Sequence, residues 1–151
     1  YGLSTAGWLY SWFGVAINKN IILLLGAIIF LIPALKFKYY KDQTFKTLFL
    51  SSILIWVVIF NHKAESATFI IAVAGVAIWF YSQERKIENT ILLFLAIIFT
   101  VLSPTDLFPK GIRENYVIPY VLKAVPCILI WFKIIYELTT FGMRKSRDLI
   151  T

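Results

Sequence analysis

Long apolar runs are the feature of this sequence that most limits what it can fold into. A helix that crosses a bilayer needs about 20 residues, with about 17 as the usual lower limit. The first, second and fifth runs reach or approach this length, and the other two complete it only with flanking polar residues. Strands are excluded because the runs lack a period of two and because an open sheet cannot satisfy its backbone in lipid. The runs are Ile21–Phe37, Phe45–Phe60, Ala67–Tyr81, Thr90–Leu102 and Tyr116–Leu138.

The composition favours lipid as the solvent for most of the chain. Apolar residues make up 60% of the sequence and charged residues 15%, against about 45–50% and about 25% in soluble domains. The same hydrophobicity excludes a disordered chain. The net charge of +7 does not indicate nucleic-acid binding, because the basic residues are scattered between apolar runs. We therefore expect an all-α integral membrane protein with about five transmembrane helices in one region, residues 1–151.

The distribution of Lys and Arg predicts the orientation, because these residues concentrate in cytoplasmic loops. If the loop after the first run is cytoplasmic, that side collects Lys36, Lys38, Lys41, Lys46, Arg85, Lys86, Arg144, Lys145 and Arg147. The opposite side collects Lys19, Lys63, Lys110 and Arg113. The loops Asn61–Ser66 and Ser103–Asn115 then face outward together with the amino end. Residues 139–151 form a cytoplasmic tail.

The opening segment, residues 1–14, is too short to span a membrane. Trp8, Leu9, Trp12 and Phe13 fall on one side of a helix. Since Trp favours the membrane–water boundary, we expect an amphipathic helix at the outer interface. It serves either as a simple anchor or as a lid over a lipid-substrate groove. The chain starts with Tyr and holds a single Met, Met143, so we expect it to be part of a longer protein.

The outward loop Asn61–Ser66 holds the one histidine of the chain, His62, next to Lys63 and Glu65. Histidine titrates near neutrality and suits proton transfer or contact with a phosphate. Lys63 offers a phosphate a point charge, and Glu65 can orient His62 or pair with Lys63. The alternative is a tight polar hairpin that only separates two helices. One His and one carboxylate fall short of a transition-metal site, so no metal is expected.

Further polar groups lie on the same predicted side. The loop Ser103–Asn115 carries Asp106, Lys110 and Arg113, and an arginine can bind a phosphate through two parallel hydrogen bonds. The alternative is an ordinary solvated connector. Lys123 lies about 10 Å into the fifth run at 1.5 Å per residue, so it needs a partner, an aqueous cavity or a route by which it snorkels outward. Tyr116, Tyr120, Lys123 and Cys127 recur at helical spacing, which predicts a polar stripe.

Several strings are similar to bacterial membrane proteins of glycosyltransferase family 87, in particular to its Bacteroidetes-type members. The segments that carry the resemblance are Phe60–Ser66, Ser103–Pro109, Tyr116–Cys127, Gly2–Ser4, Gly7–Leu9 and Trp12–Gly14. They cover nearly the whole chain and resemble the carboxyl-terminal part of such proteins. Ala67 departs from the pattern, where a proline is expected after Glu65 and Ser66.

The resemblance implies a GT-C-type enzyme of the bacterial cytoplasmic membrane. Such enzymes transfer a hexose, here mannose-like, from a polyprenyl-phosphate carrier to a lipid or glycan acceptor on the outer face, without a cofactor. His62 is the candidate catalytic residue, and the acidic base of the family has no match in this chain. Since the base is missing, the chain alone is expected to be inactive. The candidate substrate-binding residues are Asn61, Lys63, Glu65, Asp106, Lys110, Arg113 and Lys123.

Two other functions remain open from the sequence. The first is a non-enzymatic small polytopic protein, either a transporter subunit or a scaffold, in which Lys123 and His62 line a path or dock a partner. Transporters often contain inverted repeats, and the sequence shows none. The second is an O-antigen polymerase or ligase, which also uses outward basic residues with lipid-linked sugars. A longer outward loop than either loop of this chain would favour it.

Overall fold

The structure of the protein is a computed structural model that describes residues 2–150. The first residue of the expected interfacial helix, Tyr1, and the last of the expected tail, Thr151, lie outside the described residues. The all-α prediction is confirmed, because residues 2–150 form helices joined by turns and contain no strand. In chain order the elements are α1 (Thr5–Phe13), α2 (Lys19–Ala34), the short 3-10 helix η1 (Phe37–Tyr39), α3 (Gln43–Ile59), the 3-10 helix η2 (Ser66–Thr68), α4 (Phe69–Ser82), α5 (Ile87–Leu95), η3 (Ala96–Leu102), α6 (Lys110–Ile112), η4 (Arg113–Val117), α7 (Val125–Thr139) and α8 (Phe141–Asp148).

Local side chains start and stop several of these helices. The Ser4 hydroxyl accepts a hydrogen bond from the Gly7 N–H at the start of α1, which ends at Gly14 with φ +64°. This left-handed geometry is the usual helix stop for glycine. Asp42 caps α3 by accepting hydrogen bonds from the Thr44 and Phe45 amides. The Asp42 carboxylate also accepts a hydrogen bond from Lys145 of α8, at 2.7 Å, and this bond lowers the pKa of Asp42 below its usual value.

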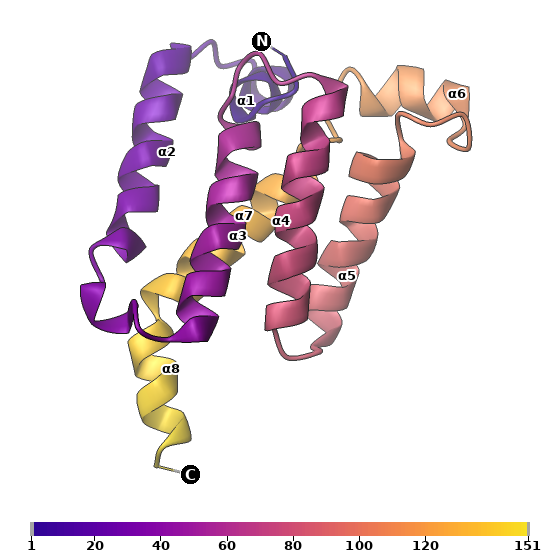
Figure 1. Cartoon of the computed structure of the whole chain (residues 1–151). Coiled ribbons are helices and arrows are strands. Elements are labelled where there is room, and N and C mark those ends of the chain that lie inside the picture. Colours follow the sequence, from indigo (N-terminus) through magenta and orange to yellow (C-terminus); the bar gives the residue numbers. More distant parts are fainter. Residues whose placement is uncertain (1, 151) are drawn as a thin grey trace.

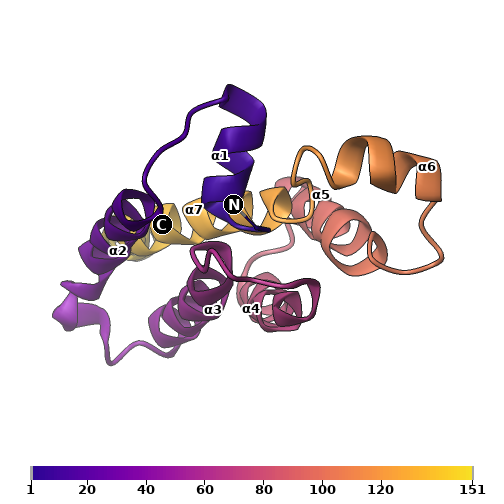
Figure 2. The same cartoon turned by 90° about the horizontal axis from the view of Figure 1, so that it is seen from above.

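Helices α3 and α4 form an antiparallel pair, and α7 crosses behind them at an angle (Figure 1). Gly75 allows the close approach of α4 to α3. A Cβ at position 75 would lie 2.8 Å from Ile55 Cγ1 and 3.0 Å from the Ser51 carbonyl oxygen. The Ser51 hydroxyl donates to the Gly75 carbonyl at 2.6 Å. Figure 2 shows α2 and α5 on the two flanks of this group, with α1 lying across one end.

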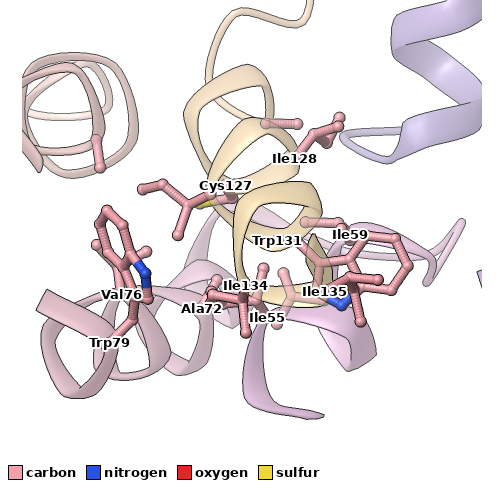
Figure 3. Close-up of a cluster of buried hydrophobic side chains, with 14 of the residues drawn as sticks. Ile55, Ile59, Ala72, Val76, Trp79, Cys127, Ile128, Trp131, Ile134 and Ile135 are labelled. Carbon is pink, nitrogen blue, oxygen red and sulfur yellow. The ribbon is translucent and has the colours of Figure 1, made fainter. Parts of the chain in front are cut away.

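The core lies where α7 meets α3 and α4, and Figure 3 shows its side chains. Trp131 of α7 and Trp79 of α4 are fully buried and are the largest side chains of the cluster. Trp131 packs edge-on against Phe60, with ring centroids 5.1 Å apart. Since large buried aromatic rings contribute much of the free energy of packing, α7 is the element that holds the helix pair in place.

The loops divide between two ends of the bundle (Figure 1). One end carries α1, the α3–α4 connection that includes residues 61–66, and α6. The other end carries the α2–α3 connection, the α4–α5 turn and α8. The loops Asn61–Ser66 and Ser103–Asn115 therefore share an end, as the sequence analysis predicts.

The individual helices are short for segments that cross a membrane. No helix within residues 2–150 is by itself long and apolar enough to cross a bilayer. Helices α7 and α8 together are long and apolar enough to cross a bilayer, but the pair is bent by 58°. Helix α2 has 16 residues, α3 has 17 and α4 has 14.

The fifth apolar run does not form one continuous helix, so that prediction is wrong. Tyr116 ends up in η4, residues 118–124 form a series of turns, and α7 starts only at Val125. Val121 adopts φ 52°, a left-handed conformation that is costly for a β-branched residue. The break separates the Tyr116–Cys127 stripe, whose two tyrosines are exposed while Lys123 and Cys127 are buried.

Candidate functional site

The loop after α3 folds as a compact turn that presents its polar side chains outward. The Asn61 side-chain oxygen accepts a hydrogen bond from the Lys63 amide at 3.0 Å, and the Asn61 carbonyl accepts one from the Ala64 amide at 3.0 Å. Ala64 is buried and anchors the turn. The side chains of His62, Lys63 and Glu65 are exposed.

The three titratable side chains of this loop do not pair with one another. Among residues 2–150, the structure gives no hydrogen bond or ion pair to the side chains of His62, Lys63 or Glu65. Glu65 therefore neither orients His62 nor pairs with Lys63, as the sequence analysis suggested it could. All three side chains are open to a ligand at the end of the bundle that carries this loop.

Helix α1 lies directly against this loop. The Thr5 hydroxyl donates to the carbonyl of Ile59, the last residue of α3, at 2.9 Å. Gly2 adopts φ +63°, and a Cβ there would lie 2.5 Å from the His62 carbonyl oxygen. Glycine is therefore required at position 2 both by conformation and by space. The amino-terminal segment forms a wall beside the His62 backbone, across the end of the bundle (Figure 2).

Lys123 reaches the same loop from the other side. Its side chain is only 5% exposed, and its ammonium donates hydrogen bonds to the Ser66 carbonyl, at 3.2 Å, and to the Ser66 hydroxyl. The ammonium also lies 5.1 Å from the centre of the Phe69 ring, a favourable cation–π arrangement. Ser66 is thus the partner that a lysine in this run needs. The contact places a buried positive charge at the base of the His62 loop.

The turns at residues 118–124, which carry Lys123, are held by two further elements. The Trp12 indole N–H of α1 donates to the Tyr120 carbonyl at 2.8 Å. The Thr100 hydroxyl, in the π-helix η3, donates to the Lys123 carbonyl at 2.8 Å. These bonds satisfy backbone carbonyls that the break leaves without helical partners. The strained conformation of Val121 is maintained by this set of contacts.

The second candidate loop lies at the same end but to one side. Figure 2 shows α6 projecting away from the bundle beyond α5. Asp106 and Lys110 are exposed, and Arg113 is half-buried. Within residues 2–150 the side chains of these three residues form no hydrogen bond or ion pair with the Asn61–Ser66 loop. The structure therefore brings Lys123 to the His62 loop and leaves Asp106, Lys110 and Arg113 apart from it.

Comparison of the chain with protein-family models, with curated proteins and with solved structures gives no match. The chemistry of the site therefore rests on the residues themselves. Lys63 and the buried Lys123 supply positive charge, and His62 supplies an imidazole that can donate or accept a hydrogen bond. The described part of the chain contains no cluster of three or more His, Cys, Asp or Glu that could hold a metal ion.

Sequence reasoning missed the residues that complete this site. Ser66 belongs to the loop motif, but its spacing gives no sign that it accepts from Lys123. Trp12 is expected from the sequence at a membrane interface, and its indole N–H instead caps a carbonyl 108 positions along the chain. Thr100 lies within an apolar run. Its hydroxyl is the sequence signal that could have indicated a polar partner on a neighbouring segment.

Proposed function

We propose that this chain is the carboxyl-terminal, membrane-embedded part of a glycosyltransferase that uses a polyprenyl-phosphate sugar. In this proposal the end of the bundle that carries the His62 loop faces outward and receives the lipid phosphate. The observation that carries the proposal is the contact of the Lys123 ammonium with Ser66. It keeps a positive charge beneath a loop whose His62 and Lys63 side chains stand open to a ligand.

The exposed surface supports a lipid environment. Monomeric soluble proteins rarely expose large contiguous apolar patches, and here several helices expose large aliphatic and aromatic side chains. Examples that are at least half exposed are Leu24 and Leu31 of α2, Ile70 of α4, and Ile91 and Phe94 of α5. Lipid tails would cover such faces without the free-energy cost of contact with water.

The short helices are compatible with this placement. At 1.5 Å per residue α2 is about 24 Å long, against a hydrocarbon core of about 30 Å. Local thinning of the bilayer and snorkelling of flanking residues bridge mismatches of this size at modest cost. Lys19 starts α2 and Lys36 follows it closely, so a long cationic side chain stands near each end.

The reaction in this proposal is a displacement at the anomeric carbon. The acceptor hydroxyl oxygen forms a bond to that carbon, its proton passes to a carboxylate base supplied by the rest of the protein, and the bond to the carrier phosphate oxygen breaks. The polyprenyl phosphate leaves with the electron pair. Lys63 and the charge of Lys123 stabilise the negative charge that develops on it. His62 donates a hydrogen bond or a proton to a phosphate oxygen.

Transfer assays on the full-length parent protein test the proposal. We expect polyprenyl-phosphate mannose to be a donor and His62→Ala to lower kcat/KM at least tenfold, within the range typical for general acid–base groups. Lys63→Ala should weaken use of the donor. Lys38→Ala, at the opposite end of the bundle, is the matched control and should keep normal turnover.

Two results would remove the proposal. Unaltered turnover in both His62→Ala and Lys63→Ala, with normal expression, would show that neither residue belongs to the active site. Use of a nucleotide sugar in place of the lipid-linked sugar would exclude the donor class.

A further inference from the structure

An open cavity of about 600 Å³ lies at the end of the bundle opposite the His62 loop. Its walls come from the start of α3, the α4–α5 turn, the carboxyl end of α7 and helix α8, at the lower end of Figure 1. None of the candidate residues of the proposed transferase site lines it. Any ligand of this cavity would therefore serve a separate purpose.

Glu137 of α7 presents a buried carboxylate in the wall of this cavity. The residue is only 4% exposed, and its Oε2 atom has no hydrogen-bond partner. The indole N–H of Trp79 approaches the carboxylate without reaching hydrogen-bond geometry. A buried carboxylate oxygen without a hydrogen bond is costly, and a donor that enters the cavity would supply that bond.

Asn89 of α5 supplies a second acceptor in the same cavity wall. It is 2% exposed, and its Nδ2 donates to the Glu84 carbonyl at 3.0 Å. That bond fixes the orientation of the amide, because a carbonyl accepts only from the NH₂ side. The Oδ1 atom of Asn89 is then left buried without a partner. Two buried acceptors in one cavity call for a ligand that carries several N–H or O–H donors.

The cavity lining also contains five basic side chains, together with the acidic Asp42, Glu84, Glu88 and Asp148. Three of its lysines are already paired with carboxylates: Lys86 with Glu84 at 3.7 Å, Lys133 with Glu88 at 3.1 Å, and Lys145 with Asp42 at 2.7 Å. Arg144 and Arg147 of α8 also line the cavity and form no ion pair with another residue of the described range 2–150. Guanidinium groups match phosphate oxygens with two parallel hydrogen bonds.

We propose that this cavity binds the phosphoethanolamine headgroup of a bilayer phospholipid. The primary ammonium donates to Glu137 and Asn89, and the adjoining phosphate accepts from Arg144 and Arg147. A primary ammonium has three N–H donors, which suits two buried acceptors, whereas a trimethylated ammonium has none. The inference rests on the membrane placement in the proposed function and not on sugar transfer, so the two can fail separately.

Lipid binding to the purified chain in detergent, followed by native mass spectrometry, tests this inference. We expect ethanolamine phospholipid to bind about tenfold more tightly than choline phospholipid, because the latter leaves the buried acceptors unpaired. Affinity should fall step by step across the mono-, di- and trimethylated headgroups, a series that needs no protein variant. Glycerol phospholipid, whose headgroup offers hydroxyl donors but no ammonium, should bind more weakly than ethanolamine phospholipid because it lacks a positive charge to pair with the Glu137 carboxylate.

Two variants separate the parts of the site. Glu137→Gln should abolish the preference for ethanolamine over choline, while Glu114→Gln, a matched change at an exposed glutamate of the opposite end, should preserve it. Arg144→Gln should weaken both lipids alike and leave the preference unchanged. If soluble phosphoethanolamine competes with the lipid, the headgroup alone is enough for binding. If the lipid binds and soluble phosphoethanolamine does not compete, the ligand is the intact bilayer lipid.

Equal binding of the ethanolamine, choline and glycerol lipids to the unmodified chain would overturn the inference. A preference that survives in Glu137→Gln would overturn it as well. If Glu137→Gln does not fold, the methylation series on the unmodified chain decides the question by itself.

Discussion

Replacing Lys123 with Met tests whether the buried ammonium stabilises the end of the bundle that carries the His62 loop. Methionine keeps most of the aliphatic stem but removes both hydrogen bonds to Ser66. Hydrogen bonds of charged groups contribute roughly 1.5–3 kcal/mol each. The net loss is smaller than the sum of the two hydrogen bonds for two reasons. Ser66 is exposed, so water can donate to it in place of the ammonium. The variant also no longer buries a charge, which removes a desolvation cost. We therefore expect Lys123→Met to lower the free energy of unfolding by about 1–2 kcal/mol.

A double-mutant cycle with Ser66→Ala isolates the contact. Ser66→Ala removes the hydroxyl acceptor but leaves the carbonyl, so it should cost about 1 kcal/mol or less. The double variant should be more stable than the sum of the two changes predicts, with a coupling energy of about 1 kcal/mol. Denaturant unfolding in detergent micelles, followed by tryptophan fluorescence, measures each value. Lys110→Met, at an exposed lysine of α6, is the control and should stay within about 0.5 kcal/mol of the unmodified chain.

Additivity would refute this reasoning. If the two changes add within about 0.3 kcal/mol, the ammonium does not interact with the Ser66 hydroxyl in solution. A Lys123→Met variant as stable as the unmodified chain would lead to the same conclusion.

Two other predictions concern packing and pH. Gly75→Ala should destabilise the chain by about 1–3 kcal/mol, because the new Cβ would lie 2.8 Å from Ile55 Cγ1, whereas Gly111→Ala meets nothing within 4 Å and should be neutral or slightly stabilising in thermal unfolding. The pKa of Asp42 is lower in the folded chain than the ordinary carboxyl value of about 3.9. Its ion pair with Lys145 therefore stabilises the fold fully above that ordinary value. This stabilisation is lost as the pH falls from the ordinary pKa to the lower pKa of the folded state. Asp42→Asn should remove this acid dependence at a cost below about 1 kcal/mol near neutral pH, since the Lys145 side chain of the pair is exposed to solvent. An unchanged acid profile in the Asp42→Asn variant would contradict the assignment.

The sequence predicts the helical class and the grouping of loops well, because both follow from repeated patterns. The apolar runs set where α2, α3 and α4 lie, and their alternating direction places residues 61–66 and 103–115 at one end. The helical class and the grouping of the loops each depend on many residues, so one residue that departs from the pattern does not change either prediction.

The break in the fifth run depends on a few residues and was not predictable from the pattern. Pro119 and Pro126 indicate a kink, but a continuous kinked helix and a series of turns fit the same prolines. The choice depends on distant partners: Trp12 and Thr100 satisfy the carbonyls of Tyr120 and Lys123. Contacts across such sequence separations leave no periodic signal, which is also why Ser66 was not identified as the partner of Lys123.

The most direct test of the account is the side of the membrane on which the His62 loop lies. Single cysteines are introduced as His62→Cys and Lys41→Cys, with Cys127 replaced by Ser, and intact cells are treated with a membrane-impermeant maleimide. We predict that the cysteine at position 62 reacts in intact cells and that the cysteine at position 41 reacts only after the cells are opened. Labelling of position 41 but not position 62 in intact cells would contradict it.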